Sequence, residues 1–248
     1  MRNVNVNEPQ NQQSCQTSVT GSAVYRILNL YACLGGNRYK WDEVAKEKGI
    51  EIEVTAVEYD EELAKLYQER FPNDKVIVAD AHKFLLENYM NYDFVWTSPP
   101  CPSHSRMRKT NTGEGERKSK ATYPDMKLYQ EILLLEHFFK GKYCVENVIP
   151  YYEPLINAKK RDRHLYWTNF NLPTDLKGRK ASNFIYSKVS DLSEFHNYDF
   201  TKYKGKQRMD KIARNLVDYE AGRTILEIAL GLEKKSNVNQ VSIFDAIT

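Results

Sequence analysis

The 248-residue sequence predicts an α/β fold built around a doubly wound, mostly parallel sheet. Apolar runs with the composition of strands alternate with segments of helical period from about residue 25 to about residue 170. Helices of this length between strands are typical of β-α-β units, in which the strands run parallel. The hydrophobic share of 41% and the charged share of 28% are ordinary for a globular chain with one substantial core.

Five segments are expected to form the strands, because they are short, apolar and rich in β-branched or aromatic residues. They are residues 24–30, 52–57, 75–79, 92–97 and 143–148. In a doubly wound sheet, ligands bind at the carboxyl ends of the strands. The residues that follow each strand are therefore the first candidates for a functional site.

The segments around these strands have helical spacing. Residues 38–48 place Trp41 and Val44 on one face of a helix, and Gly49 is a typical stop signal. Similar patterns predict four further helices. They are residues 60–70, 82–89, 125–140 and 218–230.

Composition divides the chain into four parts. Residues 1–22 are dominated by Asn, Gln, Ser and Thr and are expected to be disordered. Residues 171–211 show no helical period and carry scattered aromatic and basic residues, which predicts a small irregular lobe. The main domain would then comprise residues 23–170 and 212–232, followed by a flexible tail at 233–248.

Several classes of protein are excluded by the sequence. No apolar run approaches the roughly 18 residues of a membrane helix, and the N-terminus lacks the pattern of a signal peptide. The four cysteines, Cys15, Cys33, Cys101 and Cys144, form no Cys-x-x-Cys pair, which favours a reducing compartment. His104 lies three residues after Cys101, but without a second pair this is a poor zinc site, so no metal is expected. We therefore expect a cytoplasmic protein.

The segment after the fourth strand places a cysteine on a rigid turn. Pro99 and Pro100 stop the chain from continuing as sheet or helix, and Cys101 follows them directly. The cationic side chains of Arg106 and Arg108 lie nearby in sequence and are expected to lower the pKa of this thiol. Cys101 is therefore a candidate nucleophile.

Other polar or small residues follow the remaining strands. Gly35 and Gly36 come after the first strand and would let a ligand approach the backbone, although the segment is not G-x-G-x-x-G. Glu58 is placed to bind ribose hydroxyls, Asp80 an adenine amino group, and Glu146 ends the fifth strand with a further carboxylate. Each acid alone has an alternative interpretation as a helix cap.

Taken together, these segments resemble the DNA (cytosine-5)-methyltransferase family. The similarity covers about residues 25–170 and resumes weakly near residue 214. The matching segments are Leu-Tyr-Ala-Cys-Leu-Gly-Gly at 30–36, Val-Glu-Tyr-Asp at 57–60, Asp80, Pro-Pro-Cys at 99–101, Glu-Asn-Val at 146–148, Arg-Asp-Arg at 161–163 and Arg-Asn-Leu-Val at 214–217.

The resemblance implies a Rossmann-like methyltransferase that uses S-adenosylmethionine to methylate carbon 5 of cytosine in double-stranded DNA. Cys101 would add to carbon 6 of the base, and Glu146 would donate a hydrogen bond or proton at nitrogen 3. Arg163, with Arg161 as the alternative, would hold the carbonyl oxygen of the base. The implied cofactor contacts are Leu30, Tyr31, Leu34, Gly35, Gly36, Glu58, Tyr59, Asp80, Ala81, Pro100 and Asn215.

DNA recognition is expected in two basic segments. Residues 106–120 follow Cys101 and fit a mobile loop that would assist base flipping, or else a solvated charged segment. The lobe at 171–211 has basic blocks at 177–180 and 202–211 that could neutralise phosphates. Its aromatic residues would either stack on the target or form the core of the lobe. They are Phe184, Tyr186, Phe195, Tyr198 and Tyr203.

The sequence departs from the family pattern at Pro102 and Lys159, where Gln is usual. The lobe is also short, which resembles the compact forms carried by phages or prophages. A role in restriction-modification, in phage anti-restriction or in regulation is left open, and we expect a monomer. Two rival functions remain, namely a tRNA-methylating enzyme of the same framework and a non-catalytic DNA-binding paralogue.

The tail contains a possible partner motif. Gln240–Phe244 reads Gln-Val-Ser-Ile-Phe and resembles the short peptide that bacterial proteins dock into the replication sliding clamp. The alternative is a hydrophobic tail that folds back on the body.

Overall fold

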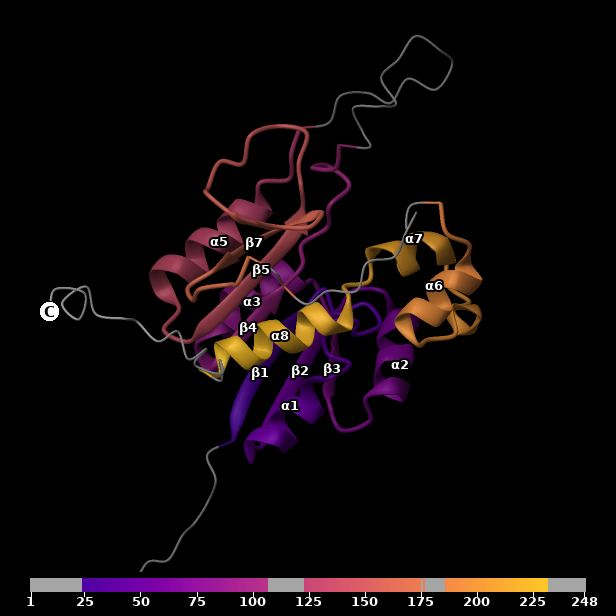
Figure 1. The fold of residues 1–248 in the computed structure, drawn as a ribbon, viewed down its shortest axis with the longest axis horizontal. Coiled ribbons are helices and arrows are strands. Elements are labelled where there is room, and N and C mark those ends of the chain that lie inside the picture. The colour runs from indigo at the N-terminus through magenta and orange to yellow at the C-terminus, as the bar shows by residue number, and fades with distance from the viewer. Residues whose placement is uncertain (1–23, 107–122, 175, 177–185, 232–248) are drawn as a thin grey trace, which may run out of the picture.

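The computed structural model describes residues 24–106, 123–174, 176 and 186–231. It contains a seven-stranded sheet with the strand order β3-β2-β1-β4-β5-β7-β6 (Figure 1). The strands are β1 (Tyr25–Leu30), β2 (Ile52–Glu58), β3 (Lys75–Val78), β4 (Phe94–Thr97), β5 (Lys142–Val148), β6 (Lys159–Arg161) and β7 (His164–Thr168). The helices are α1 (Trp41–Lys48), α2 (Glu61–Arg70), α3 (Ala81–Asn88), η1 (Tyr89–Asn91), α5 (Lys127–Phe138), α6 (Val189–His196), η2 (Phe200–Lys202), α7 (Met209–Asn215) and α8 (Tyr219–Ala229).

The sheet is parallel except at one end. Strands β1 to β5 pair in parallel, whereas β7 runs antiparallel to both β5 and β6. The chain proceeds outward from β1 to β3 and then returns to β4 on the other side of β1. This reversal opens a crevice at the carboxyl ends of β1 and β4, where doubly wound folds bind their ligands. The predicted doubly wound, mostly parallel sheet is confirmed.

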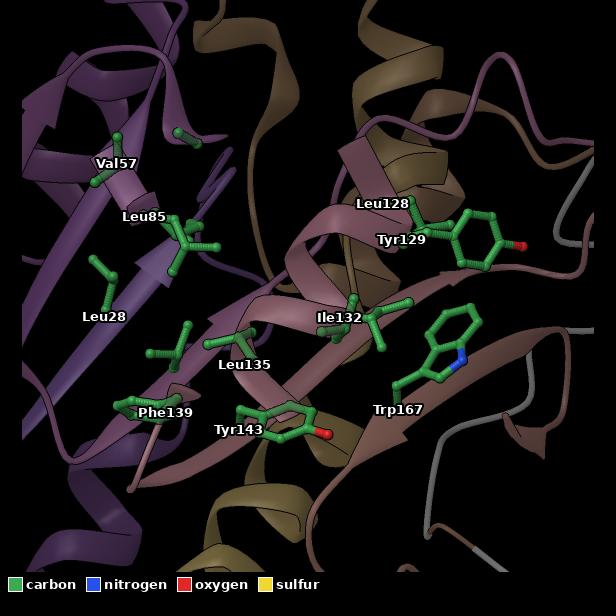
Figure 2. Close-up of a cluster of buried hydrophobic side chains, with 14 of the residues drawn as sticks. Leu28, Val57, Leu85, Leu128, Tyr129, Ile132, Leu135, Phe139, Tyr143 and Trp167 are labelled. Atoms are coloured by element: carbon green, nitrogen blue, oxygen red, sulfur yellow. The ribbon is translucent and has the colours of Figure 1, made fainter. Parts of the chain in front are cut away.

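Both faces of the sheet are covered by helices. Adjacent residues of a strand point to opposite faces, so Ile27 packs with Trp41 of α1 on one side, in a cluster that α8 completes. Leu28 packs on the other side with Leu85 of α3 and Ile132 of α5 (Figure 2). Burial on both faces explains why the parallel strands read as continuous apolar runs.

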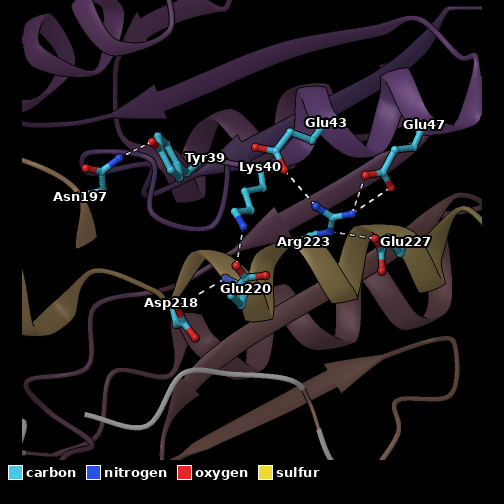
Figure 3. Close-up of polar contacts among 9 residues, drawn as sticks. All are labelled: Tyr39, Lys40, Glu43, Glu47, Asn197, Asp218, Glu220, Arg223 and Glu227. Carbon is cyan, nitrogen blue, oxygen red and sulfur yellow. Dashed lines mark hydrogen bonds and ion pairs between the residues drawn. The ribbon is translucent and has the colours of Figure 1, made fainter. Parts of the chain in front are cut away.

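The last helix returns across the sheet and packs against α1. The indole of Trp41 donates to the carbonyl oxygen of Gly222 at 3.2 Å. A Cβ at Gly222 would lie 2.2 Å from the carbonyl oxygen of Asn37, so only glycine allows this approach. The guanidinium of Arg223 pairs with carboxylates of both helices (Figure 3). These partners are Glu43 and Glu47 of α1 and Glu227 of α8 itself.

The expected strands and helices of the main domain are present with small shifts of their ends. The largest shift is at α1, which begins at Trp41 rather than at residue 38. Arg38 is instead buried in the preceding turn, where its guanidinium makes two hydrogen bonds of 2.9 and 2.8 Å to the carboxylate of Asp74. This buried ion pair determines where the helix can start.

The expectation that residues 171–211 lack helices was wrong. The described part of this segment contains α6 and η2, and α7 begins in it. Leu192, Phe200 and Tyr203 are buried together against Leu63 and Leu66 of α2. Figure 1 accordingly shows α6 and α7 beside α2. Short helices whose apolar residues are few and separated by polar ones give little periodic signal, so the sequence pattern missed them.

The antiparallel pair β6 and β7 was also not expected. Asp162 joins the two strands with a φ of 50°, which is the left-handed conformation typical of tight turns. Lys159–Arg161 has three basic residues and no apolar one, so its composition does not resemble a strand. Lys159–Arg161 forms a strand because it pairs with the apolar strand β7.

The N-terminal segment 1–22, the tail with Gln240–Phe244 and residues 107–120 of the basic loop lie outside the described residues, as does the basic block 177–180. Over the described ranges, none of the helices is both long and apolar enough to cross a membrane.

Candidate active site

A cavity of about 1280 Å³ opens at the carboxyl ends of the parallel strands. Residues from the ends of β1, β2, β4 and β5 line it, together with α7 and the segment that follows. Most of the residues singled out from the sequence contribute to this lining. They are Leu30, Tyr31, Gly36, Glu58, Tyr59, Asp80, Ala81, Pro100, Cys101, Glu146, Arg163 and Asn215. Leu34, Gly35 and Arg161 do not line it.

The turn that carries Cys101 is fixed from both sides. The side-chain amide of Asn147, on β5, donates to the carbonyl oxygen of Pro99 at 2.9 Å. The carbonyl oxygen of Cys101 accepts hydrogen bonds from the backbone of His104 at 2.9 Å and of Ser105 at 3.0 Å. His104 is buried and its Nδ1 lies 2.5 Å from the hydroxyl of Tyr152. The sulfur is therefore held at a defined place in the cavity wall.

The expectation that Cys101 has a lowered pKa was wrong. Burial raises the pKa of this thiol, and the negative charge of Glu146 raises it further. The Nε of Arg106 donates to the carbonyl oxygen of Pro150 at 3.2 Å, and Arg108 lies outside the described residues, so its expected effect on the thiol stays a prediction. The cation that lowers the pKa of Cys101 is Lys211 of α7.

Glu146 faces the same cavity from β5. Its side chain is buried, and Oε1 lies 3.5 Å from Nε2 of His164. Burial lowers the pKa of His164, which favours the neutral imidazole at neutral pH. The Arg163 guanidinium lines the cavity as well. A thiol, a carboxyl group and a guanidinium thus converge on one space.

The two arginines of the Arg-Asp-Arg segment are separated by the turn between β6 and β7. Arg161 donates to the carbonyl oxygens of Lys160 at 2.7 Å and Leu172 at 2.6 Å, and also to that of Pro173. Its side chain therefore anchors the start of the lobe. Of the two alternatives, only Arg163 is brought to Cys101 and Glu146.

Glu58 lines the cavity and is not the cap of α2. Burial raises its pKa, and its oxygens accept from the backbone N–H of Cys33 at 2.8 Å and of Tyr59 at 2.9 Å. The cap of α2 is Asp60, which accepts from Glu62 N at 3.0 Å. Glu58 thus borders the cavity at the end of β2 while its carboxylate is held by the backbone.

Asp80 is both a cap and part of the cavity wall. It caps α3 by accepting from Lys83 N at 3.0 Å, and this hydrogen bond lowers its pKa. Its other carboxylate oxygen lies 3.8 Å from the ammonium of Lys127. The alternative interpretation as a cap is therefore confirmed for Asp80, and contact with an adenine stays a prediction.

The glycines after β1 serve contacts within the chain. A Cβ at Gly35, where φ is +66°, would lie 2.3 Å from the ring of Phe71. A Cβ at Gly36 would lie 2.3 Å from the carbonyl oxygen of Val217. The segment that brings Asn215 to the cavity thus approaches Gly36 closely, and Gly36 also lines the cavity, so the expected approach of a ligand there stays a prediction.

The residues around the cavity fit S-adenosylmethionine. Glu58 and Asp80, from neighbouring strands, provide carboxylates suited to hydroxyl and amino groups. Leu30, Leu63 and Leu128 provide apolar wall between them. The described residues contain no group of three or more His, Cys, Asp or Glu side chains arranged to hold a metal ion.

Sequence reasoning missed one part of the cavity wall. Gln207, Arg208, Lys211 and Arg214 line the cavity from α7 and the segment before it. The available signal was the basic block 202–211 directly before the matching Arg-Asn-Leu-Val segment.

Residues 25–148 match the sequence model of the C-5 cytosine-specific DNA methylase family. No curated protein matches the chain. Among solved structures, a DNMT2 mutant of Spodoptera frugiperda is 23% identical, with 50% of this chain and 35% of that chain covered and a TM-score of 0.34. A putative DNA modification methyltransferase encoded within an E. coli prophage is 19% identical, with 52% and 34% covered and a TM-score of 0.31. The chain thus spans about a third of the length of these two structures.

Proposed function

The chain belongs to the C-5 cytosine-specific DNA methylase family, and we propose that it transfers a methyl group from S-adenosylmethionine to carbon 5 of cytosine in double-stranded DNA. The observation that carries the proposal is the placement of Cys101, Glu146 and Arg163 in one cavity with Glu58 and Asp80. The first three have the chemistry to activate a pyrimidine, and the last two have the chemistry to hold a nucleoside.

The proposed reaction begins when the Cys101 thiolate forms a bond to carbon 6 of the cytosine. Glu146 donates a proton at nitrogen 3, and Arg163 donates hydrogen bonds to the carbonyl oxygen. S-adenosylmethionine would supply an electrophilic methyl group, so that the enamine electrons at carbon 5 form the new bond while the methyl–sulfur bond breaks and S-adenosylhomocysteine leaves. A base then takes the carbon 5 proton, the carbon 5–carbon 6 double bond re-forms as the bond to the Cys101 sulfur breaks, and nitrogen 3 returns its proton to Glu146, which restores the ring and the thiolate.

The charges around Cys101 suit this sequence of events. Burial raises the pKa of the thiol and the negative charge of an ionised Glu146 raises it further, which favours the protonated cysteine. A neutral Glu146, which is the form that can donate a proton to the base, removes that repulsion. Formation of the thiolate and protonation of the base are therefore coupled through one carboxyl group, and the nucleophile is not exposed to solvent as a permanent anion.

The decisive experiment uses duplex DNA and transfer RNA with methyl-labelled S-adenosylmethionine. We expect label at carbon 5 of cytosine in DNA and none with Cys101→Ser. A duplex that contains 5-fluorocytosine should become covalently joined to Cys101, because fluorine at carbon 5 blocks the final elimination. Label in transfer RNA alone would show that the substrate is RNA and not DNA. Absence of transfer to either, with no trapped adduct, would instead favour a DNA-binding paralogue.

We propose that the lobe at 171–211 recognises the target, with the basic loop at 106–120 assisting base flipping. The role of the lobe is supported by Lys211, whose charge acts on Cys101, and by Arg208, which lines the same cavity. Sequencing of cytosine modification in DNA from cells that express the protein would identify the target. A Lys211→Gln protein that binds DNA with an unchanged salt dependence would argue against contact between this face and phosphates.

We also propose that Gln240–Phe244 binds the bacterial sliding clamp, on the strength of its sequence alone. A peptide of the last 16 residues should compete with a known clamp ligand, whereas the same peptide with Gln240→Ala and Phe244→Ala should not. Equal competition by both peptides would contradict the proposal.

A further inference from the structure

A carboxylate outside the proposed chemistry is buried directly behind the cavity. Glu131, on α5, is fully buried. It accepts hydrogen bonds from the hydroxyl of Tyr31 at 2.6 Å, from the hydroxyl of Thr97 at 2.7 Å and from Nδ1 of His82 at 2.9 Å. A buried charge is costly unless it is paired and hydrogen-bonded, so these three donors account for its presence.

Each donor belongs to a different part of the cavity wall. Tyr31 follows β1 and lines the cavity where the cofactor is proposed to bind. His82 lies in the first turn of α3, next to the lining residue Ala81. Thr97 is the last residue of β4 and begins the segment that leads to Cys101. One carboxylate therefore joins the cofactor side of the cavity to the strand that presents the nucleophile.

The backbone of Tyr31 shows why such a contact is needed. Its φ is 54°, which lies in the left-handed region that bulky residues rarely adopt. A conformation of this kind persists only when the surrounding structure fixes it. The hydrogen bond from the Tyr31 hydroxyl to Glu131 is such a constraint, and burial beside this carboxylate keeps the phenol protonated by raising its pKa far above the usual range.

We propose that Glu131 is a positioning residue that sets the affinity for the cofactor through Tyr31 and the placement of Cys101 through Thr97. The inference rests on the proposed function, since it assigns these two walls to the cofactor and to the nucleophile. It goes beyond that function by giving a role to a residue that contacts neither.

The first test replaces Glu131 by Gln, which keeps the shape but turns one acceptor oxygen into a donor. At least one of the three donors then faces an NH₂ group. We expect the dissociation constant for S-adenosylhomocysteine, measured by titration calorimetry without nucleic acid, to rise by about tenfold or more. Glu136→Gln is the matched control, because Glu136 lies on the same helix and is exposed. It should bind like the wild type.

The second test separates the two arms. Tyr31→Phe removes only the hydroxyl and should weaken cofactor binding, with little effect on the alkylation of Cys101 by iodoacetamide. Thr97→Val keeps the volume of the side chain but removes its hydroxyl. This variant should change the rate of Cys101 alkylation and the kcat at saturating cofactor, while its affinity for the cofactor stays that of the wild type. A purely structural network would lower the thermal midpoint of all three variants without this split.

The outcomes are distinct. If folded Glu131→Gln protein binds the cofactor as tightly as Glu136→Gln does, the inference is overturned. If Glu131→Gln does not fold, an unchanged affinity in Tyr31→Phe overturns it. If the wild-type protein binds neither S-adenosylmethionine nor S-adenosylhomocysteine, the proposed function fails and the inference falls with it.

Discussion

At the scale of single residues, Cys101 is governed by two opposing charges. Glu146 raises its pKa and Lys211 lowers it, on top of the increase due to burial. The nucleophile is therefore a thiol whose ionisation depends on the protonation of a neighbour. The reactivity of the Cys101 sulfur and the rate of methyl transfer can therefore be measured separately and compared.

Replacement of Glu146 by Gln should move these two quantities in opposite directions. Loss of the negative charge lowers the pKa of Cys101, so the midpoint of the pH profile for iodoacetamide alkylation shifts to lower pH. A shift of about one pKa unit is a tenfold change in thiolate at a pH below both values. Methyl transfer should fall by about 100-fold or more, since the proton donor is lost. Slower alkylation in this variant would contradict the assigned charges.

Lys211→Gln should have the converse effect on the thiol. Loss of the positive charge raises the pKa of Cys101, so alkylation at a fixed pH below that value becomes slower and the midpoint moves to higher pH. Lys211→Arg should keep the wild-type profile. Lys204→Gln, an exposed lysine of the same basic block, is the control and should leave the profile unchanged. If Lys211→Gln and Lys204→Gln shift the profile equally, the pKa of Cys101 responds to the net charge of the protein and not to the position of Lys211.

At the scale of elements, the contact between α8 and the turn before α1 depends on the absence of a side chain. Gly222 lies within α8, where alanine would ordinarily stabilise a helix by up to about 1 kcal/mol. Here a Cβ would meet the carbonyl oxygen of Asn37 at 2.2 Å, and backbone on both sides resists displacement. Packing therefore outweighs helix propensity at this position.

Gly222→Ala should consequently destabilise the protein. Overpacking of this kind costs about 1–3 kcal/mol, which exceeds the gain in propensity. Urea denaturation followed by circular dichroism would measure the difference in free energy of unfolding. Thr224→Ala, two residues along the same helix, is the control for propensity alone. A Gly222→Ala protein more stable than the wild type would show that α8 can shift away from the turn at little cost.

At the scale of the whole molecule, the lobe and the sheet domain share a core. Leu192, Phe200 and Tyr203 of the lobe belong to one buried cluster with Leu63 and Leu66 of α2, which itself covers the sheet. Arg70 of α2 adds a hydrogen bond to the carbonyl oxygen of His196 at 3.3 Å. The described part of the lobe is therefore not tethered loosely, and we expect it to unfold with the sheet.

Phe200→Ala tests this cooperativity. Phe200 is fully buried, and removal of its ring should cost about 3–5 kcal/mol. If the core is shared, calorimetry should show one transition at a lower midpoint, and hydrogen exchange should accelerate in β1 as well as in α6. A second, separate transition with the exchange of β1 unchanged would show instead that the lobe unfolds alone.

The sequence by itself determined the doubly wound sheet and where most of the candidate site residues would meet. Strand runs buried on both faces leave a continuous apolar pattern, and the residues after parallel strands meet at one edge whatever the details of packing. Glu58, Cys101 and Glu146 could therefore be predicted from their place at or near the carboxyl end of a strand.

Only the tertiary structure decided which groups act on one another. The effect of the Lys211 charge on Cys101, the close approach of Gly36 to Val217 and the placement of Arg163 rather than Arg161 at the cavity depend on segments far apart in the chain. The same holds for Glu131. In the sequence it is one polar residue of a helix, and only the structure shows its hydrogen bonds with Tyr31 and Thr97. Electrostatic and steric effects act through space over a few ångströms, and a linear pattern carries periodicity but no such distances.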